Sequence, residues 1–238
     1  MTKIGDENSP FGFHTWDRHL NWLEPVIRGW ETVIKYSCNR DPKDPFYYYN
    51  ERANISLLAG GAWEAGFLAL EEYSAEKRKV QNPQEIGWGR TDLYICQKSR
   101  RNKDAIFEAK QTWIRPDTKI ETIIGKRKTN GTHQTPGTGL MGAYWDAKKN
   151  LDISRVGLCF YPLEINADEY DAIEVKSKIR EIISLFINHK QSMKRLKADA
   201  VAWCFPPEMS REKTEWKTRG KRYSFFYPGI IIAMRNAG

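Results

Sequence analysis

One strand that looks buried yet carries two charges constrains this chain more than any other feature. Residues 105–113 (AIFEAKQTW) have the aromatic and apolar composition of a strand. Alternate side chains of a strand share a face, so Glu108 and Lys110 point the same way, while Ile106 and Phe107 indicate burial. Buried charges are rare unless they are paired or bind a metal, so this strand predicts either an internal ion pair or a functional site.

A second strand, at residues 88–95 (WGRTDLYI), precedes the first, and a basic turn at residues 98–103 joins the two. Such a hairpin brings Asp92 next to Glu108 and Lys110 if its register allows. Two carboxylates and an ammonium at a sheet edge suit a hard cation such as Mg²⁺, which prefers oxygen ligands. This chemistry serves phosphodiester hydrolysis, because a metal activates water and a lysine stabilises developing negative charge. The alternative is a cross-strand ion pair without catalysis.

The spacing of Asp92, Glu108 and Lys110 resembles the signature of the PD-(D/E)xK, or restriction-endonuclease-like, nuclease superfamily, with Thr91 where the nominal motif has proline. The resemblance covers roughly residues 50–161. It implies an α/β fold whose core runs helix, three strands, helix, strand, with a mixed central sheet flanked by helices. It also implies a Mg²⁺ cofactor, with Mn²⁺ able to substitute, and hydrolysis of DNA, with an endonuclease favoured. A catalytically silent scaffold that binds nucleic acid or another partner, and an RNA-directed nuclease, remain alternatives.

Members of this superfamily often place an acidic residue on the first core helix, which we expect over residues 50–78. Glu51 shares a stripe with Ile55 that should face the sheet, so it is the preferred third metal ligand beside Asp92 and Glu108. Glu64 is the other candidate. Gln111 follows the lysine as in several branches of the superfamily, although strand alternation aims its side chain at the opposite face.

The remaining pattern is an alternation of helices and strands, which predicts an α/β class. Gly60 and Gly61 within the first core helix should either bend it or allow close packing. Further helices are expected at residues 139–149 and 168–189, and strands at 154–161 (ended by Pro162), 198–205 and 223–234.

The first 45 residues are expected to form a helical extension that packs on a nuclease-like domain of residues 46–238. Apolar side chains recur at helical spacing over residues 16–34, and Pro25 should mark a kink or break. This apolar stripe can pack on its own chain, which we favour, or form a homodimer interface.

Positive charge is concentrated in the second part of the chain, within a net charge of +8. Residues 1–96 hold 11 Lys and Arg against 14 Asp and Glu, whereas residues 97–238 hold 27 against 16. Clusters of this kind attract phosphate backbones, although a basic run is also a common solvated surface. We expect DNA, with duplex favoured, to bind at basic residues in the hairpin turn and in a polar loop at residues 121–139, namely Arg100, Arg101, Lys126, Arg127 and Lys128.

No segment approaches the roughly 20 apolar residues of a membrane-spanning helix. The first seven residues (MTKIGDE) form no apolar signal core, so we expect a cytoplasmic protein without a membrane partner. The four cysteines are isolated from one another, which predicts neither a zinc site nor a disulfide framework.

Overall fold

The computed structural model describes residues 1–78, 84–98, 103–125, 137–151, 154–187, 197–218 and 221–238. The strands are β1 (Thr2–Ile4), β2 (Phe11–Thr15), β3 (Phe67–Arg78), β4 (Ile86–Gln97), β5 (Asp104–Gln111), β6 (Arg155–Asn166), β7 (Ala200–Cys204), β8 (Lys213–Thr218) and β9 (Lys221–Asn236). The α-helices are α1 (Glu24–Arg40), α2 (Glu51–Glu64), α3 (Ile120–Ile124), α4 (Gly139–Ala147) and α5 (Ala172–Ile187). Short 3₁₀ turns are η1 (Arg18–Leu23), η2 (Phe46–Tyr48) and η3 (Pro207–Ser210).

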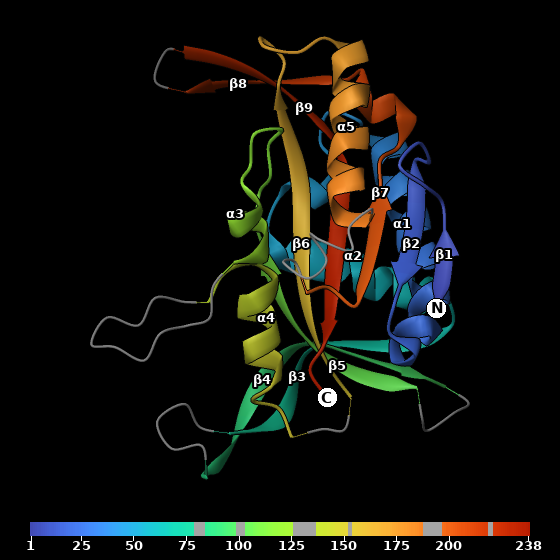
Figure 1. The fold of residues 1–238 in the computed structure, drawn as a ribbon, viewed down its shortest axis with the longest axis vertical. Coiled ribbons are helices and arrows are strands. Elements are labelled where there is room, and N and C mark those ends of the chain that lie inside the picture. The colour runs from blue at the N-terminus through green and yellow to red at the C-terminus, as the bar shows by residue number, and fades with distance from the viewer. Residues whose placement is uncertain (79–83, 99–102, 126–136, 152–153, 188–196, 219–220) are drawn as a thin grey trace.

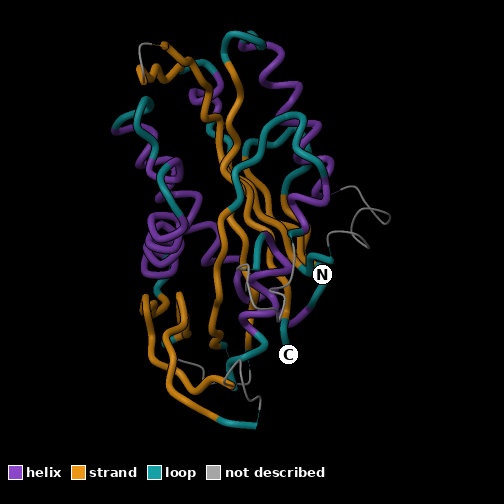
Figure 2. Tube along the Cα trace, turned by 90° about the vertical axis from the view of Figure 1, so that its left-hand side faces the viewer, coloured by secondary structure: helices purple, strands orange, loops and turns teal. Residues whose placement is uncertain are grey.

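All of these strands join one sheet, in the order β1-β2-β7-β9-β6-β5-β4-β3, with β8 paired to β9 (Figure 1). Within the described residues β5 and β6 run parallel, and every other strand pair is antiparallel. Helices cover both faces, as the turned view of Figure 2 also shows. The predicted α/β class with a mixed central sheet flanked by helices is therefore confirmed, and the sheet is largely antiparallel.

Two hydrophobic clusters lie on the two faces of the sheet. One contains buried side chains of α1 and α2, and the other contains side chains of α3, α4 and α5. Strand β9 supplies both clusters in alternation: Ile230 and Ile232 enter the first, whereas Ile231 and Ala233 enter the second. The middle of the sheet is therefore covered on both faces, and a charged side chain there needs compensation.

The helix expected over residues 50–78 is wrong in its second half. Helix α2 ends at Glu64, and Gly66 follows with a φ of 80°, a left-handed conformation that commonly terminates helices at glycine. The chain then runs as strand β3, from Phe67 to Arg78. The buried apolar residues Phe67 and Ala69 of this segment alternate along a strand instead of following a helical stripe.

Pro162 does not end its strand, contrary to the sequence-based expectation. Strand β6 continues to Asn166, because Pro162 lies past Phe160, the last partner of β5, where a missing N–H disrupts little of the ladder. Its carbonyl still accepts the N–H of Ile114, at 3.1 Å.

The N-terminal segment contains strands that the sequence pattern did not predict. Strand β2 pairs with β7, so residues 1–45 extend the central sheet as well as supplying helix α1. Pro25 lies in the first turn of α1 rather than in the middle of a helix, and it separates η1 from α1. The apolar stripe of α1 is buried against the same chain, including Ile27, Trp30 and Ile34.

The described part of the chain contains no helix that is long and apolar enough to cross a membrane.

Helices α1 and α2 pack at very close range through two glycines. A Cβ atom built on Gly29 would lie 2.1 Å from the carbonyl oxygen of Gly61, and one built on Gly61 would lie 2.3 Å from the backbone nitrogen of Trp30. Both obstacles are main-chain atoms, which cannot rotate away. Of the two roles considered for the adjacent glycines, close packing is the one that Gly61 performs.

Replacing Gly61 by alanine should therefore destabilise the protein, whereas replacing its neighbour should not. Gly61→Ala forces the two helices apart, and we expect a loss of about 1–3 kcal/mol in the free energy of unfolding. Gly60→Ala is the matched control, because its Cβ would meet only Val33 side-chain carbons at 3.7 Å. Alanine should gain up to about 1 kcal/mol there from helix propensity. Urea denaturation of both variants measures the difference, and equal effects would contradict the packing argument.

Candidate active site

The hairpin of β4 and β5 brings Asp92 next to the two charged residues of β5. The pairing of β4 with β5 ends at Leu93 and Phe107, and Asp92 directly precedes Leu93 on β4. There the strands stop pairing, and the Asp92 carboxylate accepts the backbone N–H of Ala109 at 2.6 Å. This hydrogen bond replaces a main-chain contact by a side-chain contact, and it holds Asp92 beside Glu108.

Glu108 and Lys110 both contact the segment that contains α4, as expected for two side chains on one face of a strand. Oε1 of Glu108 accepts the Nδ2 hydrogen of Asn150 at 3.0 Å. Nζ of Lys110 lies 3.2 Å from Oδ2 of Asp146 and donates to the carbonyl of Ala109 at 2.8 Å. Glu108 is buried, with 6% of its surface exposed, and Lys110 is partly buried.

A second cation contacts Glu108 from the other side. Lys77, near the end of β3, places Nζ 2.5 Å from Oε1 of Glu108 and also donates to the carbonyl of Arg90. Gly89 makes this possible, because a Cβ there would lie 2.9 Å from Cδ of Lys77. The end of β3 is itself anchored: the Arg78 N–H donates to the carbonyl of Lys149 at 2.8 Å.

Glu51 reaches the site from the first turn of α2. The Asn50 side chain caps this helix by accepting the Ala53 N–H at 2.9 Å, and a carboxylate in the first turn is favoured by the helix dipole. Asn54, fully buried, donates to Oε1 of Gln111 at 3.0 Å and so ties the helix start to the end of β5. The backbone of Gln111 also hydrogen-bonds Glu51.

The charges of these residues act on one another. Burial raises the pKa of Glu108, Lys77 opposes this shift, and the negative charge of Asp92 adds to it. Burial likewise raises the pKa of Glu51, with Lys110 opposing and Asp92 adding to the shift. The buried Glu108 and the half-buried Glu51 share a negative neighbour, so additional positive charge would stabilise the charged form of both.

Lys110 and Asp146 each stabilise the charged form of the other through their contact. Burial disfavours the charged form of Lys110, but Asp146 and Glu51 outweigh it and raise the pKa of the ammonium. Burial would also raise the pKa of Asp146, yet the hydrogen bond from Lys149 and the charge of Lys110 lower it overall. Lys110 therefore stays protonated in this site.

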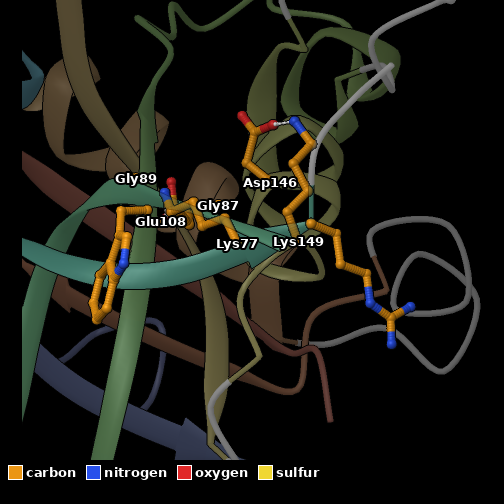
Figure 3. Close-up of a pocket in the computed structure, with 8 residues that line it drawn as sticks. Lys77, Gly87, Gly89, Glu108, Asp146 and Lys149 are labelled. Carbon is orange, nitrogen blue, oxygen red and sulfur yellow. Dashed lines mark hydrogen bonds and ion pairs between the residues drawn. The ribbon is translucent and has the colours of Figure 1, made fainter. Parts of the chain in front are cut away.

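The acidic residues open onto two different cavities. A cavity of about 340 Å³ is lined by Glu108 and Asp146 together with Lys77 and Lys149, and Figure 3 shows these side chains around it. Glu51 and Asp92 line a smaller cavity of about 50 Å³.

The structure separates the other candidates from this group. Glu64 is exposed on the last turn of α2, at the opposite end of the helix from Glu51. The side chain of Gln111 faces Asn54. The basic candidates Arg100, Arg101, Lys126, Arg127 and Lys128 lie outside the described residues, and residues 121–124 of the expected loop belong to α3.

Sequence reasoning missed Lys77, Asp146 and Asn150. Lys77 was missed because its strand had been assigned to a helix, and correct assignment of β3 would have shown a lysine near the start of the hairpin. Asp146 and Asn150 lie more than 30 residues from Glu108, so no local spacing indicated them.

The oxygen chemistry of the site fits a divalent cation. Carboxylates of Asp92, Glu108 and Glu51 are hard donors of the kind that Mg²⁺ prefers. In addition, Oδ1 of the fully buried Asn150 has no hydrogen-bond partner among the described residues, although its amide nitrogen contacts Glu108. In the same residues, no three His, Cys, Asp or Glu side chains already stand close enough together to hold a metal ion.

No protein-family model, no curated protein and no solved structure was found to match the chain. The resemblance to the PD-(D/E)xK superfamily therefore remains an expectation from the sequence. The function has to be inferred from the site itself.

The Lys77–Glu108 contact yields a pH-dependent stability prediction. In metal-free buffer, Lys77→Met should reduce the free energy of unfolding by about 3 kcal/mol at pH 8, because it leaves a buried carboxylate without its cation. Loss of Lys77 raises the pKa of Glu108 further, so the loss of folding stability is complete at pH values above the pKa that Glu108 has in the variant. It disappears as the pH falls below the unfolded value of about 4.3, where the carboxyl group is neutral in both states.

Denaturation with EDTA between pH 4 and pH 8 measures this effect. Lys178→Met is the matched control, because the Lys178–Glu181 pair is at the surface and should contribute about 0–1 kcal/mol. A loss at Lys77 that does not vary with pH would mean that packing of its methylene groups, rather than its charge, is responsible.

Proposed function

We propose that this protein is a metal-dependent nuclease that hydrolyses phosphodiester bonds in DNA, acting as an endonuclease. The observation that carries the proposal is that Glu51, Asp92, Glu108 and Lys110 come from three separate elements, α2, β4 and β5, and are linked to one another. Asp92 accepts the backbone N–H between Glu108 and Lys110 and acts on the charges of Glu108 and Glu51, while Glu51 acts on Lys110. Three carboxylates and a charged lysine are the groups that such hydrolysis requires, and Glu108 opens onto the larger cavity while Glu51 and Asp92 open onto the smaller one.

The order of elements around the site supports the same reading. Along the chain, α2, β3, β4 and β5 are followed by α4 and β6, and β6 pairs in parallel with β5. This succession of helix, three strands, helix and strand is the one implied by the PD-(D/E)xK resemblance. The short helix α3 lies between β5 and α4 and adds to that plan.

In this proposal Asp92, Glu108 and Glu51 hold Mg²⁺, for which Mn²⁺ can substitute. When bound, the metal lowers the pKa of a water and neutralises charge on a phosphate oxygen. Lys110 is held by Asp146 near the same carboxylates, where its ammonium can stabilise negative charge that develops on the phosphate. The basic residues Arg100, Arg101, Lys126, Arg127 and Lys128 are proposed to contact the DNA backbone, with duplex favoured.

A second candidate is a catalytically silent scaffold that binds nucleic acid. The observation in its favour is the ion pair between Lys77 and Glu108, because a carboxylate that already has a cation can be purely structural. An RNA-directed nuclease would use the same residues as a DNA nuclease. Incubation with Mg²⁺ and supercoiled plasmid, linear duplex, single-stranded DNA and RNA separates these possibilities, since a silent scaffold cuts none of them.

Replacing the central residues should abolish cleavage without unfolding the protein. Asp92→Asn and Glu108→Gln each remove one anionic ligand while keeping shape, and Lys110→Ala removes the cation that stabilises the phosphate. We expect each variant to cut plasmid at least about 100-fold more slowly. Glu64→Gln is the control, because Glu64 is exposed at the far end of α2.

Gel shifts in Ca²⁺ should show that all four variants still bind DNA, since backbone contacts lie mainly outside the acidic group. If Asp92→Asn or Glu108→Gln cuts as fast as the unaltered protein at limiting Mg²⁺, the cluster is a structural ion-pair network and the nuclease proposal is wrong.

The role of the helical acid makes a separate prediction. Because Glu51 lies next to Lys110 and Asp92, Glu51→Gln should raise the Mg²⁺ concentration that gives half-maximal cleavage by about tenfold. Glu64→Gln should leave it unchanged. A Mg²⁺ titration of plasmid nicking measures both values, and the reverse ranking would assign the ligand role to Glu64.

A further inference from the structure

Lys77 occupies a position that the proposed reaction does not use. Its ammonium is 2.5 Å from Oε1 of Glu108, and its side chain is only 19% exposed. The second contact of Nζ, to the carbonyl of Arg90, fixes the lysine against β4. Ordering a lysine side chain costs conformational entropy. Because Lys77 is held by both a carboxylate and a carbonyl, it has a fixed position in the site, unlike a mobile surface lysine.

The local backbone is arranged to deliver this cation. Gly89 leaves room for the methylene groups of Lys77, since a Cβ there would collide with them. On the other side, Lys77 forms an isolated bridge with Asn150, whose amide donates to the same Oε1 of Glu108. Lys77 and Asn150 therefore both bind one carboxylate oxygen of a proposed metal ligand.

The cavity beside this contact gives a solvent cation access to it. Lys77, Glu108, Asp146 and Lys149 all line the opening of about 340 Å³ (Figure 3). A divalent ion that enters there meets a carboxylate whose charge is already compensated. Binding then has to include the separation of Lys77 from Glu108, and that separation weakens the apparent affinity.

We propose that Lys77 is a positioning residue that acts through Glu108: it holds this carboxylate while no metal is bound and competes with the divalent cation for it. The inference rests on the proposed function, because it takes Glu108 as a metal ligand. The predicted effect on metal affinity is opposite to that of most substitutions in a metal site, since removal of Lys77 should make metal binding tighter.

Isothermal titration with Mg²⁺ and with Mn²⁺, in the absence of DNA, tests the inference. Lys77→Gln should bind both ions at least about tenfold more tightly than the unaltered protein. Lys77→Arg keeps a cation and should restore weak binding. A lysine that only supports the fold would change affinity in the opposite direction, because a loosened site binds metal less well.

Lys149→Gln is the matched control for general electrostatics. Lys149 lines the same cavity, but it pairs with Asp146, at 2.6 Å, rather than with Glu108. Removing its charge should therefore tighten metal binding by less than about threefold. Equal gains in Lys77→Gln and Lys149→Gln would overturn the inference, since the effect would then be net charge alone.

Other outcomes separate this inference from the nuclease proposal. Equal metal affinity in the unaltered protein and in Lys77→Gln, with cleavage of plasmid intact, would overturn the role of Lys77 and leave the nuclease proposal standing. Tighter binding in Lys77→Gln with no cleavage of any nucleic acid would support the role of Lys77 and count against catalysis. No detectable metal binding in any variant would overturn the inference, while plasmid cleavage would still decide the function.

Discussion

A carboxylate on a strand that is covered on both faces has to be compensated by its neighbours, and Glu108 is that carboxylate. Its compensation comes from Lys77 near the end of one strand and from Asn150 just after a helix. These two residues also pair with each other through the main chain. The hairpin of β3 and β4 is thereby joined to the segment after α4, and residues of both line the open cavity next to Glu108.

Two of the acids of the site form ion pairs with lysines, so they are not free carboxylates. Lys77 pairs with Glu108, whereas Lys110 pairs with Asp146. Asp92 has instead a backbone N–H as its partner, and its charge acts on the acids around it. Such a network is stable without an added ion, yet its pairings can be exchanged when one arrives. The internal pairing of these residues is thus compatible with the proposed catalysis.

The sequence was most informative where the chemistry is local. The proximity of Asp92 to Glu108 and Lys110 could be predicted because strand alternation and a hairpin are short-range rules. Glu51 was preferred over Glu64 because it shares a helical stripe with Ile55. Lys77 was missed because residues 67–78 contain helix-favouring residues, and the pairing with β4 overrides that propensity. Strands β1 and β2 were also missed, since they are only three and five residues long, and β2, which pairs with β1, is itself paired with the distant strand β7. Tertiary pairing, which no local pattern encodes, accounts for each of these differences.

The strand order has a consequence for how the chain reaches this state. Strand β9 follows every other strand in the sequence, yet it lies between β6 and β7 near the middle of the sheet. The residues of the candidate site, from α2 to β6, can associate during synthesis as soon as they have emerged. One edge of β6 then stays unpaired until β9 has been synthesised and can pair with both β6 and β7. During that interval the unpaired edge of β6 is open to other strands, so the nascent chain is exposed to edge-to-edge aggregation until β9 pairs with β6.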